Sequence, residues 1–224
     1  MSYVFEDFSS EGGASFLYPP ELEISIMIGL GKLSEQTCDE LSQFILSQEQ
    51  NILSSYEPVS VGGMQDGLST RWTSYNLLTF EHEALAPLKE VIKEAYLAYT
   101  THNNIPRFKN VIQCWANVLR SGDKLQPHEH EFSRRCLSAT ISLSQTETST
   151  IYHFPFKLKN GARYTNTVRV PTLKGAITLF PGWLTHFTSP VPQGVTRVTL
   201  GLNIIDGSES GILLDFDTGT SFDL

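Results

Sequence analysis

The sequence predicts a mainly β protein in which two N-terminal helices support a C-terminal β-sandwich or barrel. Before residue 105, apolar residues recur at helical spacing in two separate segments. After Pro106, short runs rich in β-branched and aromatic residues follow one another, and Gly, Pro, Ser and Asn separate them. We find no internal repeat, low-complexity tract or linker, so we expect a single domain over residues 1–224. Within it, residues 1–105 would form a helical support region and residues 106–224 the β-core.

Two segments of the N-terminal half have the pattern of amphipathic helices. The first spans residues 33–51, where Ser34 is the predicted N-cap and Glu35 favours the first turn. Its apolar face comprises Cys38, Leu41, Phe44 and Ile45. The second spans residues 83–104, with an acidic start and two asparagines at its end. Between them, the Gly- and Ser-rich segment 60–78 predicts a loop that leads into a strand.

Short β-forming runs in the second half of the chain predict the strands of the core. Turn-forming residues separate these runs, as is typical of a sandwich or barrel. The runs cover residues 110–119, 136–144, 150–154, 165–170, 176–180, 186–191, 195–205 and 211–216.

Composition limits the partners and the compartment. The chain carries 24 Asp and Glu against 16 Lys and Arg, a formal net charge of −8. This charge opposes a duplex nucleic-acid partner, because phosphate binding requires clustered cations. Three widely spaced cysteines favour a reducing compartment over a disulfide framework. The acidic N-terminus lacks a signal-peptide pattern, and no apolar run approaches the roughly 20 residues that a membrane helix needs. We therefore expect a cytoplasmic protein with no membrane partner.

The stretch LQPHEHEF, residues 125–132, places two histidines two positions apart after a proline. In an extended strand, residues i and i+2 point to the same face. His128 and His130 would then present both imidazoles to one point, while Glu129 points away. Imidazoles suit iron, zinc, copper or nickel. Two solvated histidines at the start of a strand would give the same pattern, so the pair alone does not decide.

A third histidine follows at hairpin spacing. A strand run after Gly175 leads to the Pro181–Gly182 turn, and His186 lies early in the next run. Together with the segment 122–130, this has the form of two hairpins that close a barrel around three imidazoles. For His186 taken alone, a core histidine behind a tight turn is the favoured interpretation. Taken together, the three residues predict a metal site formed by His128, His130 and His186.

Period-two alternation predicts two unlike faces for the run 195–205. The apolar face, which would pack in the core, comprises Val198, Leu200, Leu202 and Ile204. The polar face comprises Arg197, Thr199, Gly201 and Asn203. A guanidinium binds carboxylates bidentately and the hydroxyl of Thr199 adds a donor, so this face favours an anion site. An ordinary surface arginine on a half-exposed sheet is the alternative.

These elements resemble the Fe(II)/2-oxoglutarate-dependent dioxygenase superfamily: a His-x-(acid or His) pair, a distal His, and an Arg eleven residues later on the next strand. The resemblance runs from about residue 115 to residue 205 and is closest to an uncharacterised bacterial and phage group of 2OG-Fe(II) oxygenases. It implies a double-stranded β-helix (jelly-roll, cupin-like) core, Fe(II) as cofactor and 2-oxoglutarate as cosubstrate. The implied activity couples oxidative decarboxylation of 2-oxoglutarate to C–H oxidation of a small molecule or a protein side chain.

The resemblance also implies roles for individual residues. The implied metal ligands are His128, His130 and His186. Arg197 and Thr199 would bind the C5 carboxylate of 2-oxoglutarate, and there would be no catalytic residue beyond the metal centre. Asn117 and Trp115 share a strand face. Either could therefore line the cavity. We expect Asn117 to contact the cosubstrate, whereas core packing is the commoner role for Trp115.

Residue 130 departs from the superfamily pattern, because Asp or Glu is usual there. A three-His site lacks the anionic ligand, and a bulged strand would bring Glu129 to the site instead. The G-x5-H-x-H spacing also resembles the cupins, but Arg134 and Arg135 replace their following glutamate, and their motif has no counterpart of Arg197. Two alternatives are therefore open. One is a three-His cupin-type metalloenzyme that does not use 2-oxoglutarate, and the other is a non-catalytic binding module.

Overall fold

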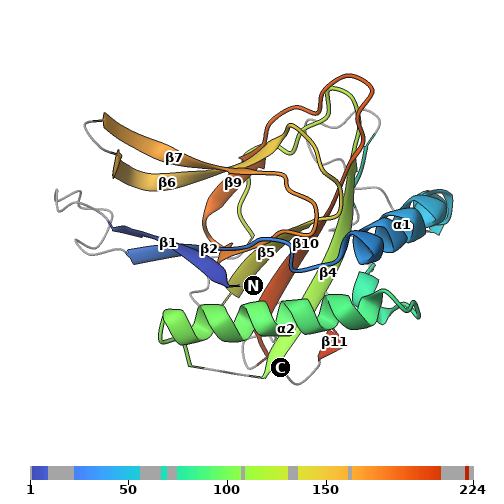
Figure 1. Cartoon of the computed structure of the whole chain (residues 1–224), viewed down its shortest axis with the longest axis horizontal. Coiled ribbons are helices and arrows are strands. Elements are labelled where there is room, and N and C mark those ends of the chain that lie inside the picture. The colour runs from blue at the N-terminus through green and yellow to red at the C-terminus, as the bar shows by residue number, and fades with distance from the viewer. Residues whose placement is uncertain are drawn as a thin grey trace.

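Two antiparallel sheets form the framework of the molecule (Figure 1). The structure is a computed structural model that describes residues 2–9, 23–55, 67–69, 75–106, 109–130, 136–160, 163–207 and 220–221. The large sheet has the order β1 (Tyr3–Ser9), β2 (Glu23–Gly29), β8 (Ile177–Pro181), β5 (Cys136–Ser142), β10 (Arg197–Asp206), β4 (Asn110–Leu119) and β11 (Thr220–Ser221), and β3 (Leu68–Ser69) also pairs with β4. The small sheet has the order β7 (Arg163–Pro171), β6 (Ser149–Asn160) and β9 (Thr185–Thr188).

Both predicted helices are present and support the large sheet. Helix α1 covers Glu35–Ser55 and α2 covers Leu85–His102, with a short 3-10 helix η1 at Leu77–Thr79. The N-cap prediction is confirmed, because the hydroxyl of Ser34 accepts a hydrogen bond from the backbone N–H of Thr37 at 3.1 Å. In Figure 1, α2 runs across the large sheet on the side away from β6 and β7.

Apolar side chains form two separate clusters. The larger one joins the helices to the large sheet and includes Leu41, Leu88 and Leu200. The smaller one lies between the sheets and includes Ile24, Ile26, Tyr152, Phe154, Val170, Phe180 and Leu184. Apolar packing therefore fills only part of the space between the sheets, and polar side chains line the rest.

The β-core follows the predicted runs closely. All the runs from 110–119 to 195–205 contain strands, whereas the run 211–216 and most of the predicted loop 60–78 lie outside the described residues. The support region 1–105 is not purely helical, because it also supplies β1, β2 and β3. Strand β2 is buried at five of its seven positions, and isoleucine occupies every second position of its sequence EISIMIG. This period-two pattern is typical of a strand, so the expectation of a helical support region overlooked it.

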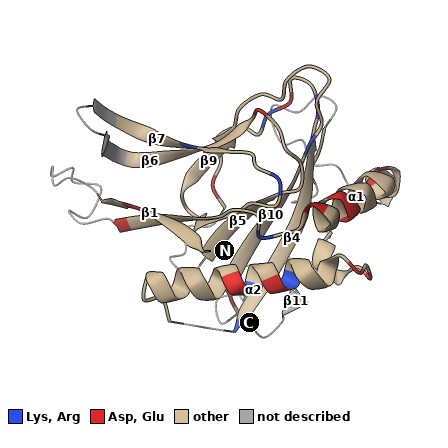
Figure 2. Cartoon of the chain, in the orientation of Figure 1, with Lys and Arg blue, Asp and Glu red and all other residues tan. Residues whose placement is uncertain are grey.

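Charged residues and cysteines differ in where they lie in the fold. Acidic residues lie on both helices, whereas the strands carry few charged residues (Figure 2). All three cysteines are buried and free. Among the described residues, neither helix combines the length and the apolar character that a membrane span requires.

Candidate active site

Three histidines converge between the two sheets. The segment before His130 runs alongside β9, where the N–H of His128 donates to the carbonyl of His186 at 3.1 Å and the N–H of His186 donates back at 2.9 Å. The N–H of His130 donates to the carbonyl of Gly182, in the turn before β9, at 2.9 Å. These backbone bonds bring a ligand nitrogen from each imidazole within 4.8 Å of the others.

The other ring nitrogen of each histidine has an oxygen partner. The Nδ1 of His128 lies 2.7 Å from the carbonyl of Gln126, and the Nδ1 of His186 lies 2.9 Å from the carbonyl of Leu184. The Nδ1 of His130 lies 2.5 Å from Oδ1 of Asn203. Carbonyl and amide oxygens only accept, so each Nδ1 carries a proton, and in the neutral imidazole the lone pair is then on Nε2. Metal-ligating histidines are oriented by such contacts.

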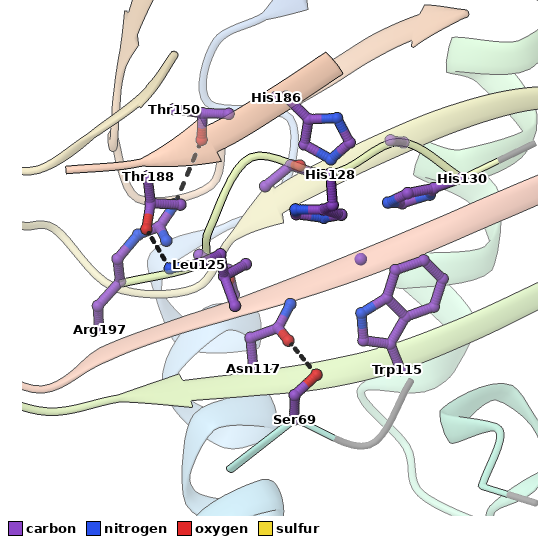
Figure 3. A pocket seen from close by; sticks show the side chains of 14 residues that line it. Ser69, Trp115, Asn117, Leu125, His128, His130, Thr150, His186, Thr188 and Arg197 are labelled. Carbon is purple, nitrogen blue, oxygen red and sulfur yellow. Dashed lines mark hydrogen bonds between the residues drawn. The ribbon is translucent and has the colours of Figure 1, made fainter. Parts of the chain in front are cut away.

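The predicted arginine lines the same pocket as the histidines (Figure 3). The side chain of Arg197 is almost fully buried, with 1% exposed. Its Nη2 donates to the hydroxyl of Thr150 on β6 at 3.3 Å, and among the described residues its Nε and Nη1 have no hydrogen-bond partner. Arg197 is thus not the surface arginine of the alternative interpretation, because the small sheet covers it.

A cation in this position is unfavourable without an anion. Burial lowers the pKa of Arg197 to about 10, which still leaves the guanidinium charged at neutral pH. Nearby, burial raises the pKa of Tyr152, so this phenol stays neutral and does not balance the charge. No carboxylate occurs among the described residues that line the pocket. The site therefore presents a buried positive charge to whatever it binds.

The large sheet supplies the remaining predicted residues. Thr199 on β10 and Asn117 on β4 lie opposite each other in the strand register, and both line the pocket. The hydroxyl of Ser69 on β3 donates to Oδ1 of Asn117 at 2.7 Å (Figure 3). This hydrogen bond engages the amide oxygen of Asn117 and not its NH2 group. Sequence reasoning missed Ser69 and Thr150, because each belongs to a strand that approaches the site only through tertiary pairing.

Trp115 is buried and also lines the pocket. Its indole lies 5.3 Å from the His130 ring, centroid to centroid, and covers Gly201 on the neighbouring strand. A Cβ at residue 201 would lie 2.4 Å from the indole Cε2. Gly201 therefore allows the indole to lie flat on β10 and to form one wall of the site.

The two alternatives for the second metal ligand were His130 and Glu129. The cluster of candidate metal ligands contains His130 and not Glu129. Arg134 and Arg135 lie outside the described residues. The donor set is thus three neutral imidazoles whose Nδ1 atoms are held by oxygen acceptors, next to a buried cation. Such a site fits a divalent transition metal together with an anionic small molecule.

Comparison with known proteins agrees with this geometry. Residues 113–203 match a family model described as "Putative 2OG-Fe(II) oxygenase", and this segment contains every predicted site residue. A comparison with curated proteins gives no significant match.

Solved structures of low sequence identity share the fold. A prolyl-4-hydroxylase from Pseudomonas putida is 14% identical, with a TM-score of 0.58 over 81% of this chain and 92% of its own. A prolyl hydroxylase from Trichoplax adhaerens, in complex with a peptide fragment of the hypoxia inducible factor oxygen degradation domain, is 15% identical, with a TM-score of 0.61 over 84% and 86%. The carbocyclase SnoK from nogalamycin biosynthesis is 14% identical, with a TM-score of 0.57 over 89% of both chains.

The fold is thus the double-stranded β-helix that the sequence predicted. A shared fold does not establish chemistry by itself. Over residues 113–203, which contain the three-histidine group, the chain is similar to the family described as "Putative 2OG-Fe(II) oxygenase".

Proposed function

We propose that the chain is an Fe(II)- and 2-oxoglutarate-dependent oxygenase, a hydroxylase with an all-imidazole iron site. The proposed ligands of Fe(II) are His128, His130 and His186. The proposed ligands of 2-oxoglutarate are Arg197, Thr199 and Asn117. The single observation that carries the cosubstrate assignment is the buried guanidinium of Arg197, which has hydrogen-bonding capacity to spare among the described residues.

The C5 carboxylate of 2-oxoglutarate satisfies that guanidinium. An isolated buried charge costs several kcal/mol, and a carboxylate with bidentate hydrogen bonds offsets much of this. The hydroxyls of Thr150 and Thr199 flank the guanidinium as additional donors. A cupin-type enzyme that does not use 2-oxoglutarate would have no need for this residue.

In the proposed metal site, the protein supplies three imidazole ligands from short segments that backbone hydrogen bonds hold in place. Because each Nδ1 is engaged, the rings are oriented before metal binds. The chemistry that bound iron supplies is the activation of dioxygen at positions that the protein ligands leave open. Without a protein carboxylate, the pocket has one more positive charge than the usual site, and this extra charge favours a dianionic cosubstrate.

Two further residues prepare the pocket for 2-oxoglutarate. Ser69 holds the oxygen of Asn117, so the amide NH2 is directed to an acceptor in the cavity. The indole of Trp115 covers the floor beside His130 and excludes water from it. A dry pocket strengthens the electrostatic contacts to the cosubstrate.

The proposed substrate is a small molecule or a protein side chain with an oxidisable C–H bond. One structural neighbour is bound to a peptide fragment, and another acts in the biosynthesis of nogalamycin. The acidic surface of this chain, with a net charge of −8, disfavours a duplex nucleic-acid substrate.

The test is a titration of the oxygen-free, Fe(II)-loaded protein with 2-oxoglutarate, followed by metal-to-ligand charge-transfer absorption. Arg197→Ala should weaken 2-oxoglutarate binding tens-fold or more while Fe(II) binding persists, because truncating a buried charged pair costs on the order of 2–5 kcal/mol. Arg197→Lys should recover only part of the loss, since an ammonium cannot reproduce the bidentate fork. The exposed Arg169 on β7 provides the matched control, and Arg169→Ala should bind like the wild type.

Two results would contradict the proposal. Absence of the band in the iron-loaded wild type would favour the cupin-type enzyme or the binding module. Equal 2-oxoglutarate affinity in the wild type and Arg197→Ala would remove Arg197 from the site.

A further inference from the structure

Behind His130, two buried polar side chains face each other on neighbouring strands. Ser138 on β5 and Asn203 on β10 are direct partners in the strand register. Ser138 is fully buried and Asn203 is 8% exposed. Both lie on the inner face of the large sheet, on which the nearby residues Thr140 and Gly201 line the pocket. Polar groups at this depth are costly unless they are hydrogen-bonded.

Their partner is the ring nitrogen of His130 that faces away from the site. The Nδ1 of His130 lies 2.5 Å from Oδ1 of Asn203 and 2.9 Å from Oγ of Ser138, and Oγ of Ser138 donates to the same Oδ1 at 3.1 Å. An amide oxygen only accepts, so a bare Nδ1 at 2.5 Å would set lone pair against lone pair. The Nδ1 must therefore carry a proton, and in the neutral imidazole Nε2 is then left with its lone pair.

The other two histidines are oriented in a different way. The Nδ1 atoms of His128 and His186 each bond to a backbone carbonyl two residues earlier in the chain. Local backbone therefore orients those two rings. The orientation of His130 instead depends on side chains 8 and 73 residues away in sequence, which substitution can remove without changing the backbone.

This difference falls on the residue that departs from the superfamily pattern. A carboxylate ligand coordinates through either oxygen and has no tautomer to fix. An imidazole with its proton on Nε2 directs an N–H at the metal and cannot coordinate through that atom. An imidazole in this position thus needs an acceptor behind it, and both Ser138 and Asn203 meet that need.

We propose that Ser138 and Asn203 are positioning residues that hold His130 in the Nδ1–H tautomer, and that they allow an imidazole to serve as the second metal ligand. The inference rests on the proposed function, because it takes His130 as a ligand. Loss of such outer contacts typically lowers metal affinity by about 10- to 100-fold.

The first measurement is the tautomer of His130 in the full-length, metal-free protein. Long-range 1H–15N correlation spectra at a pH above about 7.5, where histidine is neutral, distinguish Nδ1–H from Nε2–H. The wild type should show Nδ1–H at His130. The Ser138→Ala/Asn203→Leu double variant should show Nε2–H or a mixture. A wild-type His130 in the Nε2–H form overturns the inference, whether or not the protein binds metal.

The second measurement is Co(II) affinity, determined by competition with a chromophoric chelator. The double variant should bind Co(II) about 10- to 100-fold more weakly than the wild type. Asn203→Asp retains an acceptor, so its Co(II) affinity should stay within about threefold of that of the wild type. If the double variant folds poorly, Asn203→Leu alone is compared with Asn203→Asp instead. Ser142→Ala is the matched control, because Ser142 is a buried serine on the same strand and the same face as Ser138.

The outcomes separate this inference from the proposed function. Equal Co(II) affinity in the wild type and a folded double variant overturns the inference alone. A wild type that shows the Nδ1–H tautomer but binds no Co(II) or Fe(II) overturns the proposed metal site, and with it the role assigned to the pair.

Discussion

The two faces of β10 are equally buried but built from different chemistry. All ten residues of the strand are buried. The face toward the helices carries Val198, Leu200, Leu202 and Ile204, which belong to the large apolar cluster. The face toward the small sheet carries Arg197, Thr199, Gly201 and Asn203. Burial alone therefore does not separate core from site in this strand.

The difference lies in whether the buried groups are satisfied within the protein. Leu200 and its neighbours make apolar contacts that need nothing further, and they stabilise the fold. Asn203 is satisfied by His130 and Ser138, whereas the guanidinium of Arg197 has only Thr150 among the described residues. Burying the guanidinium without a carboxylate partner among the described residues lowers the stability of the fold. This face is therefore suited to binding an anion rather than to stabilising the fold.

The largest effect should come from the helix-facing side. Leu200→Ala removes a fully buried side chain from the large cluster and should lower the free energy of unfolding by about 2–5 kcal/mol. Urea unfolding followed by circular dichroism measures it. The matched change on the other face, Thr199→Val, should cost less than about 1 kcal/mol and should weaken 2-oxoglutarate binding instead. Similar stability losses for both variants would abolish the distinction between the faces.

A smaller loss of stability is expected where the site face meets Trp115. Gly201→Ala places a methyl group 2.4 Å from the indole Cε2, so either the ring or the strand must move. The cost should be about 1–3 kcal/mol, as for other overpacked positions. A shift in tryptophan emission and weaker 2-oxoglutarate binding should accompany it.

The Gly201→Ala/Trp115→Phe double variant tests this mechanism. A smaller ring relieves the contact, so the double variant should recover part of the lost stability. If it is no more stable than Gly201→Ala alone, contact with the indole is not the reason for glycine at this position.

Arg197→Met should raise the stability of the ligand-free protein, whereas the preceding variants lower it. Replacing a buried cation that faces no carboxylate among the described pocket residues by an apolar side chain of similar length should raise the free energy of unfolding of the ligand-free protein by about 1 kcal/mol or more. Saturating 2-oxoglutarate, with Co(II) present, should stabilise the wild type by about 2.7 kcal/mol at 100 times Kd and should leave the variant unchanged. Thermal and urea unfolding with and without ligand measure both effects. A destabilised Arg197→Met would mean that Arg197 is part of the structural core.

The smallest effect is expected at Glu129. Glu129→Ala should leave Co(II) stoichiometry and affinity nearly unchanged, because the candidate cluster contains His130 and not Glu129. His186→Ala is the positive control and should remove most bound metal, since two remaining ligands hold a dication poorly. His130→Asp should still bind iron, because it restores the usual carboxylate. Loss of metal on Glu129→Ala would reveal a bulged segment and a carboxylate ligand.

Local pattern was sufficient to predict much of this protein. The Ser34 N-cap, both helices and most strands of the β-core follow from periodicity and turn residues, because these depend on neighbours in sequence. The two faces of β10 also follow from period two. His128 and His130 lie instead in a segment outside the named strands, which is bridged to β9 at His128. The same period-two reasoning would also have predicted β2, because isoleucine occupies every second position of EISIMIG, but the expected helical support region overlooked this strand.

Only the tertiary structure decided what these residues do together. Whether Arg197 is a surface cation or a buried one depends on the small sheet that covers it, and that sheet is paired through segments distant in sequence. Other contacts in the site also join segments that are distant in sequence. They are the contacts of Ser69 with Asn117, of Trp115 with Gly201, and of Ser138 and Asn203 with His130. A sequence determines which groups are available and which face of a strand they occupy. Their burial and partners, and therefore their chemistry, come from contacts that no local period encodes.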